Sequence, residues 1–235
     1  MKNLKNWDNK TWLSSDKYIK KFCSFIETKK KLKNDTKILD IGCGRANIIS
    51  KLAKKHNFKQ KPTGIDVLKH QDVKRNVRFL KTHALKFLKR TEKFDLIIIK
   101  QTIHLMSKKN QFLLLKMCKN SLNKKGKLLI FSLRTKNNQI PVFKLLEKKL
   151  KASLKKDERI LKNIKKVLKK IKVSYFNIKV NIKKNYYIKM IKKRYISCLL
   201  NMTQREIDDG VGEINRNYKK QIKFTDSLIC ISFTK

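Results

Sequence analysis

Two acids and two glycines close short apolar runs in a pattern that could bind a nucleotide. The run 38–41 contains Asp40 and leads into Gly42 and Gly44, which permit a sharp turn and a close approach of a ligand to the backbone. About twenty-five residues further on, a second run ends at Asp66, at the spacing expected of a carboxylate that binds both hydroxyls of a ribose. These residues predict a nucleotide site at the carboxyl ends of two strands.

Strands and helices must alternate around this turn to position it. The turn leads into an amphipathic stretch with isoleucine and leucine on one side, and later apolar runs are separated by helical stretches. This alternation predicts an α/β fold with a parallel, doubly wound sheet. We expect strands at 38–41, 63–67, 77–80, 94–99, 126–133, 173–182 and 227–233, and helices at 47–56 and 110–122.

Three motifs carry a resemblance to a known family. The stretch 40–44, Gly64-Ile65-Asp66, and the run 94–98 followed by Ile103-His104 resemble S-adenosylmethionine-dependent methyltransferases with a Rossmann-like fold. The resemblance covers roughly residues 33–133 and implies a three-layer α/β fold whose seven-stranded sheet is mainly parallel, with its last strand antiparallel. A dinucleotide-binding domain fits less well, because the turn reads D-x-G-x-G-x-A instead of G-x-G-x-x-G.

The resemblance also implies which residues hold S-adenosylmethionine, the expected cofactor. Asp66 would bind the ribose and Val67 would lie against the adenine, although a helix cap and a core position are their alternatives. His83 stands where the family often has an acid, and a neutral imidazole lacks the charge and second oxygen of a carboxylate. The predicted cofactor-binding residues are Asp40, Gly42, Cys43, Gly44, Asp66, Val67, His83, Ala84, Lys100 and Gln101.

His104 is the candidate catalytic base. Methyl transfer is an in-line displacement, so an enzyme must align the nucleophile, exclude water and remove a proton from the acceptor. An unperturbed imidazole pKa of about 6.5 suits that task. Orienting the methionine end of the cofactor or capping the next helix are its alternatives. The stretch 100–103 lacks the Asp/Asn-Pro-Pro-aromatic turn of methylases that act on base amines.

The two ends of the chain are expected to enclose the acceptor. We predict an N-terminal helical cap at 1–32, with a helix that begins near Ser15, and a methyltransferase domain at 33–235. Helical insertions are expected at about 142–171 and 184–220, and Thr203 with Glu206 predicts a capping box within the second. The tail resembles that of the type 11/25 small-molecule methyltransferases, in which such helices help to form the substrate chamber. The candidate substrate residues are Trp12, Tyr18, Arg134, Tyr187, Arg194 and Tyr195, for which core packing and surface positions are the alternatives.

The charge of the chain is extreme, with 62 Lys and Arg against 17 Asp and Glu and a formal net charge of +45. Such a charge attracts polyanions. Lysine, however, greatly outnumbers arginine and is spread along the whole chain, whereas arginine is the residue suited to bidentate recognition of phosphate and bases. These features favour a compositional drift towards lysine over a polyanionic partner as the cause of the charge. A small-molecule methyl acceptor is the leading hypothesis. An RNA methyltransferase and a non-catalytic scaffold that binds nucleic acid or membrane are the alternatives.

The remaining composition indicates an intracellular setting. Five cysteines are widely spaced and no C-x-x-C occurs, so we expect free thiols in a reducing cytoplasm and no metal site. The N-terminus lacks the apolar segment of a signal peptide, and no apolar run is long enough to span a membrane.

Overall fold

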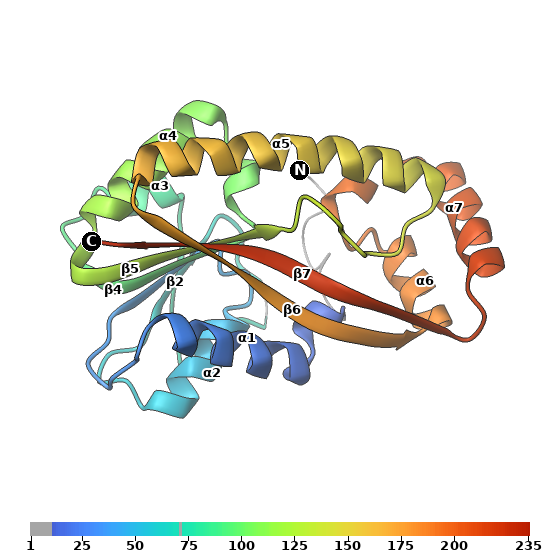
Figure 1. The fold of residues 1–235 in the computed structure, drawn as a ribbon. Coiled ribbons are helices and arrows are strands. Elements are labelled where there is room, and N and C mark those ends of the chain that lie inside the picture. Colours follow the sequence, from blue (N-terminus) through green and yellow to red (C-terminus); the bar gives the residue numbers. More distant parts are fainter. Residues whose placement is uncertain (1–10, 71) are drawn as a thin grey trace.

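A twisted seven-stranded sheet forms the middle layer of the protein, with helices on both of its faces (Figure 1). The computed structural model describes residues 11–70 and 72–235. The strand order is β3-β2-β1-β4-β5-β7-β6, and β7 alone runs antiparallel to its neighbours, which confirms the predicted sheet. The strands are β1 (Ile38–Ile41), β2 (Thr63–Asp66), β3 (Arg78–Lys81), β4 (Phe94–Lys100), β5 (Leu122–Leu133), β6 (Ile171–Lys183) and β7 (Gln221–Thr234).

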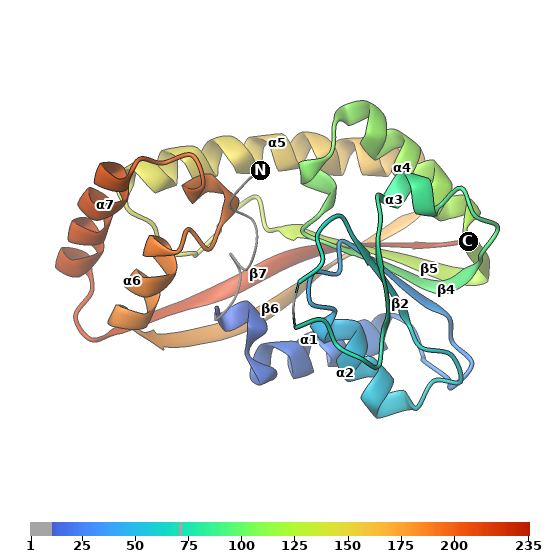
Figure 2. The ribbon, with the colours of Figure 1, turned by 180° about the vertical axis from the view of Figure 1, so that it is seen from behind.

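Different helices cover the two faces of the sheet (Figures 1 and 2). On one face lie α1 (Asp16–Lys29) and α2 (Asn47–His56), whose buried residues join the larger of two apolar clusters. On the other face lie α3 (Ala84–Phe87), α4 (Lys108–Asn120) and the second half of α5 (Lys144–Leu168). Both faces of the parallel strands β1, β4 and β5 are therefore covered, as a parallel sheet requires.

The alternation of side chains along each strand decides what faces α1. Ile38 of β1 and Ile98 of β4 belong to the cluster on the α1 side, and Leu228 of β7 does too. Since successive side chains point to opposite faces, Asp40 and Lys100 share that side. They stand at the carboxyl ends of β1 and β4, where the strand order reverses and α/β proteins place their ligands.

β6 and β7 form a two-stranded ribbon that extends beyond the other strands of the sheet. The two strands pair from Ile171↔Phe233 to Lys183↔Gln221, whereas β5 stops pairing with β7 at Leu133↔Leu228. The predicted final strand, 227–233, was therefore too short, because polar residues alternate with apolar ones in the part of β7 beyond β5. At the far end of the ribbon lie α6 (Lys184–Lys192) and α7 (Gln204–Asn217), with the short η3 (Ser197–Leu199) between them (Figures 1 and 2).

Capping residues set the helix starts that the sequence predicts. The Ser15 hydroxyl accepts a hydrogen bond from the Tyr18 amide at 3.2 Å at the start of α1. At α7, the Thr203 hydroxyl accepts from the Glu206 amide at 3.2 Å, and the Glu206 carboxylate accepts from the Thr203 amide at 2.6 Å. Both predicted starts are thus confirmed, because each side chain satisfies an amide that the helix leaves unpaired.

Several lysines neutralise the C-terminal ends of helices at the opposite edge of the sheet. The ammonium groups of Lys93 and Lys235 donate to the carbonyl of Asn120, where α4 ends, at 2.8 and 3.3 Å. Lys127 donates to the carbonyl of Lys29, where α1 ends. Cations are favourable at this end of a helix dipole, so part of the basic composition stabilises the fold itself. Among the described residues, no helix is both long and apolar enough to span a membrane.

A pair of glycines on α7 offers a test of the packing between α7 and the start of α5. A Cβ at Gly210 would lie 2.5 Å from the buried ring of Phe143, whereas at Gly212 the nearest atom would be Arg216 Nη1 at 3.6 Å. Gly210→Ala is expected to lower the free energy of unfolding by about 1–3 kcal/mol through overpacking. Gly212→Ala should raise it by roughly 0.5–1 kcal/mol, because alanine favours the helix. Urea unfolding of both variants measures the difference, and equal stabilities would contradict this packing.

Candidate active site

The glycine turn after β1 and the acid that ends β2 are joined by hydrogen bonds. The amides of Gly42 and Cys43 donate to the carbonyl of Ile65 at 2.8 and 3.1 Å, which extends the pairing of β1 with β2 into the turn. The Gly44 amide donates to Asp66 Oδ2 at 2.9 Å. Gly42, Gly44 and Asp66 therefore lie together at the carboxyl ends of the adjacent strands β1 and β2.

Both glycines are needed for the shape of this turn. Gly42 and Gly44 have φ values of +74° and +53°, in the left-handed region that glycine adopts without strain. A Cβ at Gly42 would lie 2.1 Å from Thr102 Oγ1, so the backbone approaches the end of β4 closely there. A Cβ at Gly44 would meet nothing within 4 Å. The turn thus faces open space at Gly44, which is where a ligand could approach the backbone.

The residues predicted to lie near the adenine surround the ends of β2 and β3. Asp66 Oδ1 accepts from the Leu68 amide at 3.0 Å, and the side chain of Val67 is 54% exposed. His83 is exposed, and its Nδ1 accepts from the Leu85 amide at 3.4 Å to cap α3. Ala84 is buried at the first position of α3. An adenine contact for Val67, His83 and Ala84 stays a prediction.

Two ionisable side chains of opposite kind, Asp40 and Lys100, lie at the carboxyl ends of β1 and β4, beside the glycine turn. Asp40 is 3% exposed, and this burial raises the pKa of its carboxyl to about 7 despite the opposing positive charge of Lys100. The Lys100 ammonium donates to Gln101 Oε1 at 3.4 Å. It also lies 5.4 and 5.6 Å from the ring centroids of Tyr18 and Phe22 on α1. This arrangement brings opposite charges and aromatic faces together at one edge of the sheet.

His104 lies in η2 (Ile103–Leu105), the short helix that follows β4. Burial lowers the pKa of its imidazole, so the ring is neutral at pH 7 and able to accept a proton. The buried amide of Gln111 donates to the carbonyls of Ile103 and Met106 at 3.2 and 2.9 Å. These bonds fix η2 against α4 and hold His104 in a defined place.

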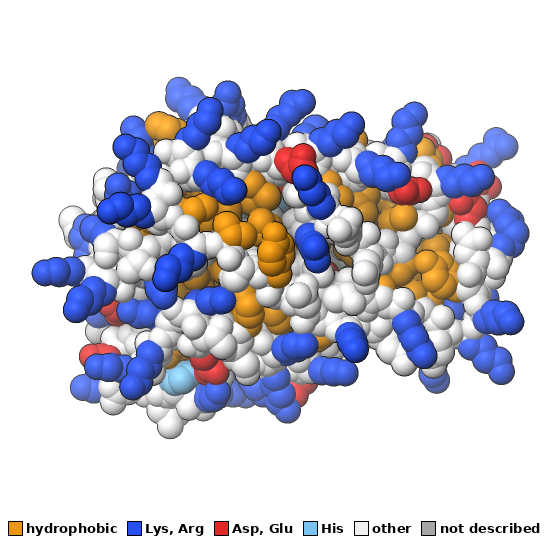
Figure 3. Space-filling view, in the orientation of Figure 1, with side chains coloured by type: hydrophobic (Ala, Val, Ile, Leu, Met, Phe, Trp, Pro, Cys, Tyr) orange, Lys and Arg blue, Asp and Glu red, His pale blue; other side chains and the backbone are white. Residues whose placement is uncertain are grey.

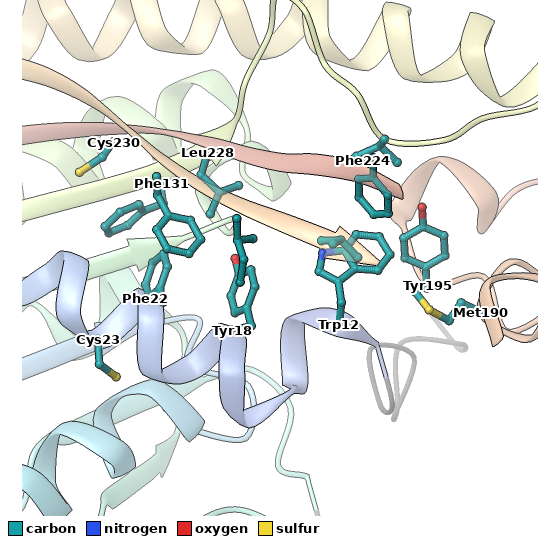
Figure 4. Close-up of a cluster of buried hydrophobic side chains, with 14 of the residues drawn as sticks. Trp12, Tyr18, Phe22, Cys23, Phe131, Met190, Tyr195, Phe224, Leu228 and Cys230 are labelled. Atoms are coloured by element: carbon teal, nitrogen blue, oxygen red, sulfur yellow. The ribbon is translucent and has the colours of Figure 1, made fainter. Parts of the chain in front are cut away.

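An aromatic cluster joins the N-terminal segment to the far end of the β6–β7 ribbon (Figure 4). Trp12, in η1 (Trp12–Ser14), lies 5.2 Å from Tyr195 and 5.1 Å from Phe224 between ring centroids. The hydroxyls of Tyr187 and Tyr195 are 2.8 Å apart, and Tyr187 also donates to the carbonyl of Pro141. The structure thus brings together predicted substrate residues from both ends of the chain. Residues 1–10 of the predicted cap lie outside the described residues.

The two predicted arginine contacts have structural partners elsewhere. The guanidinium of Arg194 donates to the carbonyls of Leu199 and Met202 at 2.6 Å each, and so closes the loop before α7. The guanidinium of Arg134 lies over the ring of Tyr175, 5.1 Å from its centroid. A substrate contact for either arginine stays a prediction.

The sequence analysis overlooked Asp226, which lies on β7 at the same edge of the sheet. Its side chain is 1% exposed, and its Oδ2 accepts a hydrogen bond from the indole N–H of Trp12 at 2.9 Å. A signal was present, because Asp226 interrupts the inward-facing apolar positions Ile222, Phe224 and Leu228 at a spacing of two. The predicted strand began one residue too late to include it.

Comparisons with known proteins agree with this fold and site. A model of the methyltransferase domain family matches residues 32–195, more than half of the chain. A protein of Anabaena variabilis described as a methyltransferase of an antibiotic biosynthesis pathway shares 14% identity at a TM-score of 0.63, over 89% of this chain and 95% of that one. The plantazolicin methyltransferase BpumL, solved with S-adenosylhomocysteine, shares 19% identity at a TM-score of 0.54, over 98% and 87%. A methyltransferase of Archaeoglobus fulgidus shares 17% identity at 0.52, over 92% of both chains. A search of curated proteins found no match.

The sheet order defines a Rossmann-like fold, with the glycine turn at the end of β1. The family match makes the assignment specific, and the chain belongs to the methyltransferase domain family. It is an S-adenosylmethionine-dependent methyltransferase, and S-adenosylmethionine is its cofactor.

The buried carboxyl of Asp40 makes the stability of the protein depend on pH. A pKa of about 7 in the folded protein, above the ordinary value of 3.8, means that the folded state holds the proton more tightly. The contribution of Asp40 to the free energy of unfolding should therefore fall as the pH rises from about 4 to 7. Asp40→Asn removes this loss. The melting temperature of the variant minus that of the wild type should therefore be larger at pH 8 than at pH 5.

Exposed Asp35 provides the matched control. The difference between Asp35→Asn and the wild type should be the same at both pH values. Thermal unfolding without added cofactor measures these differences, and a pH-independent effect of Asp40→Asn would contradict the account of Asp40.

Proposed function

We propose that the protein transfers the methyl group of S-adenosylmethionine to a small-molecule acceptor, bound between the N-terminal segment and the far end of the ribbon. The supporting observation is the closed contact of Trp12 with Tyr195 and Phe224 at the edge of the sheet that carries the glycine turn. Aromatic rings that shield one side of a binding site exclude water from the reaction and suit a small organic acceptor. The helices α6 and α7 complete this proposed substrate cap.

In this proposal the cofactor lies along the carboxyl ends of the strands. Asp66 binds the ribose hydroxyls, with Val67 against the adenine. At the other end, Asp40 and Lys100 bind the ammonium and carboxylate groups of the methionine, and Gln101 adds a hydrogen bond. The arrangement of charges supports this, since an acid and a base lie together beside the turn. Bound S-adenosylmethionine supplies a methyl group on a positively charged sulfur, which a nucleophile can attack.

We assign the proton transfer to His104. Its neutral imidazole can accept a proton from the acceptor as the nucleophile forms. The support for this role is its position in η2, which follows β4 directly. The hydrogen bonds of Gln111 hold the backbone on both sides of His104.

The distribution of charge supports a small acceptor over RNA. On the face seen in Figure 3, lysines and arginines are spread over the whole surface and do not gather at one place. Other lysines contact helix ends at the edge of the sheet opposite the glycine turn. An RNA methyltransferase would be expected to concentrate basic residues around its active site.

Methyl transfer from labelled S-adenosylmethionine tests this proposal, with the dialysable metabolites and the RNA of the same cells as acceptors. Label should enter the metabolite fraction. His104→Asn should lower kcat by about a hundredfold or more, with the Kd for S-adenosylmethionine unchanged, because a positioned base contributes that much. Transfer to RNA alone would contradict the small-molecule assignment, and an unchanged kcat in His104→Asn would contradict the role of the histidine.

A further inference from the structure

Asp226 is a buried carboxylate that the proposed function does not use. β5 leaves the sheet after pairing Leu133 with Leu228, so Asp226 lies just beyond its end. By the alternation along β7, Asp226 points to the same side as Leu228, which is the side that Asp40 and Lys100 share. Three charged groups therefore converge on the space next to α1.

The negative charge of Asp226 carries a cost that its hydrogen bond with Trp12 does not explain. The inward-facing residues before it on β7, Ile222 and Phe224, are apolar. Burying a carboxylate costs several kcal/mol. Burial still raises the pKa of Asp226, although the indole N–H of Trp12 and the charge of Lys100 both oppose that shift. The indole N–H of Trp12 needs an acceptor here, but an uncharged amide oxygen would supply one without this cost, so the carboxylate points to a ligand.

The hydroxyl of Tyr18 is an independent sign of a ligand at the same place. The side chain is 1% exposed, and its hydroxyl has no hydrogen-bond partner among the described residues. Burial raises the pKa of Tyr18, and the negative charge of Asp226 raises it further. The ring centroid of Tyr18 lies 5.4 Å from that of Phe176, which pairs with Leu228 two residues from Asp226. A buried hydroxyl left without a partner costs about 1–3 kcal/mol.

The surroundings of these groups suit a cation. The ammonium of Lys100 lies over the rings of Tyr18 and Phe22, and its charge acts on both Asp40 and Asp226. In this structure the protein's own ammonium group therefore stands among two acids and two aromatic faces. Such a setting favours alkylammonium ions through both charge and cation–π attraction. If Lys100 pairs with the cofactor carboxylate, as proposed above, a second ammonium can take its place beside Asp226.

We propose that Asp226 and Tyr18 bind the methyl acceptor and that this acceptor is an amine, recognised as its ammonium ion, which loses a proton to His104 before its nitrogen takes the methyl group. The inference rests on the proposed function and specifies its substrate class. An ammonium group donates hydrogen bonds to the carboxylate of Asp226 and to the phenol oxygen of Tyr18. The hydrogen bond from Trp12 orients the carboxylate. A carboxylic acid in the same place would face the repulsion of Asp226.

Binding of small probes to the full chain, saturated with S-adenosylhomocysteine, tests this inference without requiring turnover. The probes are n-butylammonium chloride and n-butanol, with sodium chloride at equal concentration as the ionic control. Tryptophan fluorescence is the readout, because Trp12 contacts Asp226 directly. Butylammonium should bind at least about tenfold more tightly than butanol, the value of a charge-assisted hydrogen bond.

Variants assign that preference to the two residues. Asp226→Asn retains an acceptor for the Trp12 indole and should weaken butylammonium binding by about tenfold or more, with the Kd for S-adenosylhomocysteine unchanged. Tyr18→Phe removes a hydroxyl that has no partner, so it should fold normally and bind butylammonium more weakly. Asp157→Asn is the matched control, because Asp157 is a buried acid on α5 and should leave binding unchanged.

The outcomes separate this inference from the proposed function. Butylammonium that binds no better than butanol, or equally well to the wild type, Asp226→Asn and Tyr18→Phe, would overturn the amine assignment. If Asp226→Asn does not fold, Tyr18→Phe decides. Failure of S-adenosylhomocysteine to bind the wild type would instead contradict the proposed cofactor site.

Discussion

The hydrogen bond between the Gly44 amide and Asp66 Oδ2 is the contact on which the site depends. It joins the turn after β1 to the end of β2, and it requires backbone conformations at Gly42 and Gly44 that other residues adopt only with strain. The second oxygen of Asp66 is held by the Leu68 amide, so the carboxylate has a fixed orientation. Each carboxylate oxygen has a second lone pair, so a ribose hydroxyl could donate to it while these two contacts remain.

The two edges of the sheet carry different kinds of polar contact: one holds the candidate site, and the other holds contacts that stabilise the fold. The carboxyl ends of β1, β4 and the neighbouring part of β7 bring together acids, one lysine and aromatic rings on the α1 side. The opposite edge brings lysines to the C-terminal ends of α1 and α4. The doubly wound topology produces both arrangements, because every helix that follows a parallel strand points its C-terminus away from the ligand edge. A net charge of +45 is thus compatible with an active site whose buried charges are mainly acidic.

Local patterns predicted the parts of the molecule whose cause is local. The strand before Gly42, the helix 47–56 and the capping box at Thr203 each follow from neighbouring residues, and each was confirmed. The family motifs added the seven-stranded sheet with its antiparallel last strand, and the cofactor. Long-range packing could not be read in the same way. The contact of Trp12 with Tyr195 joins segments from opposite ends of the chain, and no periodicity in either segment indicates its partner.

Asp226 was missed because the start of its strand was predicted too late in the sequence. Its strand continues because β6 pairs with it beyond the end of β5, which is a property of the ribbon and not of residues near Asp226. Thr102 was missed for a related reason, since its contact with Gly42 depends on how β4 and β1 lie together. Asp226 lies on β7 beyond the end of β5, and Thr102 lies just after β4, beside the turn that follows the shorter β1.

Calorimetric titration of S-adenosylhomocysteine into the wild type and Asp66→Ala tests the central claim directly. If Asp66 binds the ribose, the variant should lose charge-assisted hydrogen bonds to both hydroxyls, and its Kd should rise about a hundredfold or more. A folded Asp66→Ala protein with the Kd of the wild type would contradict the account.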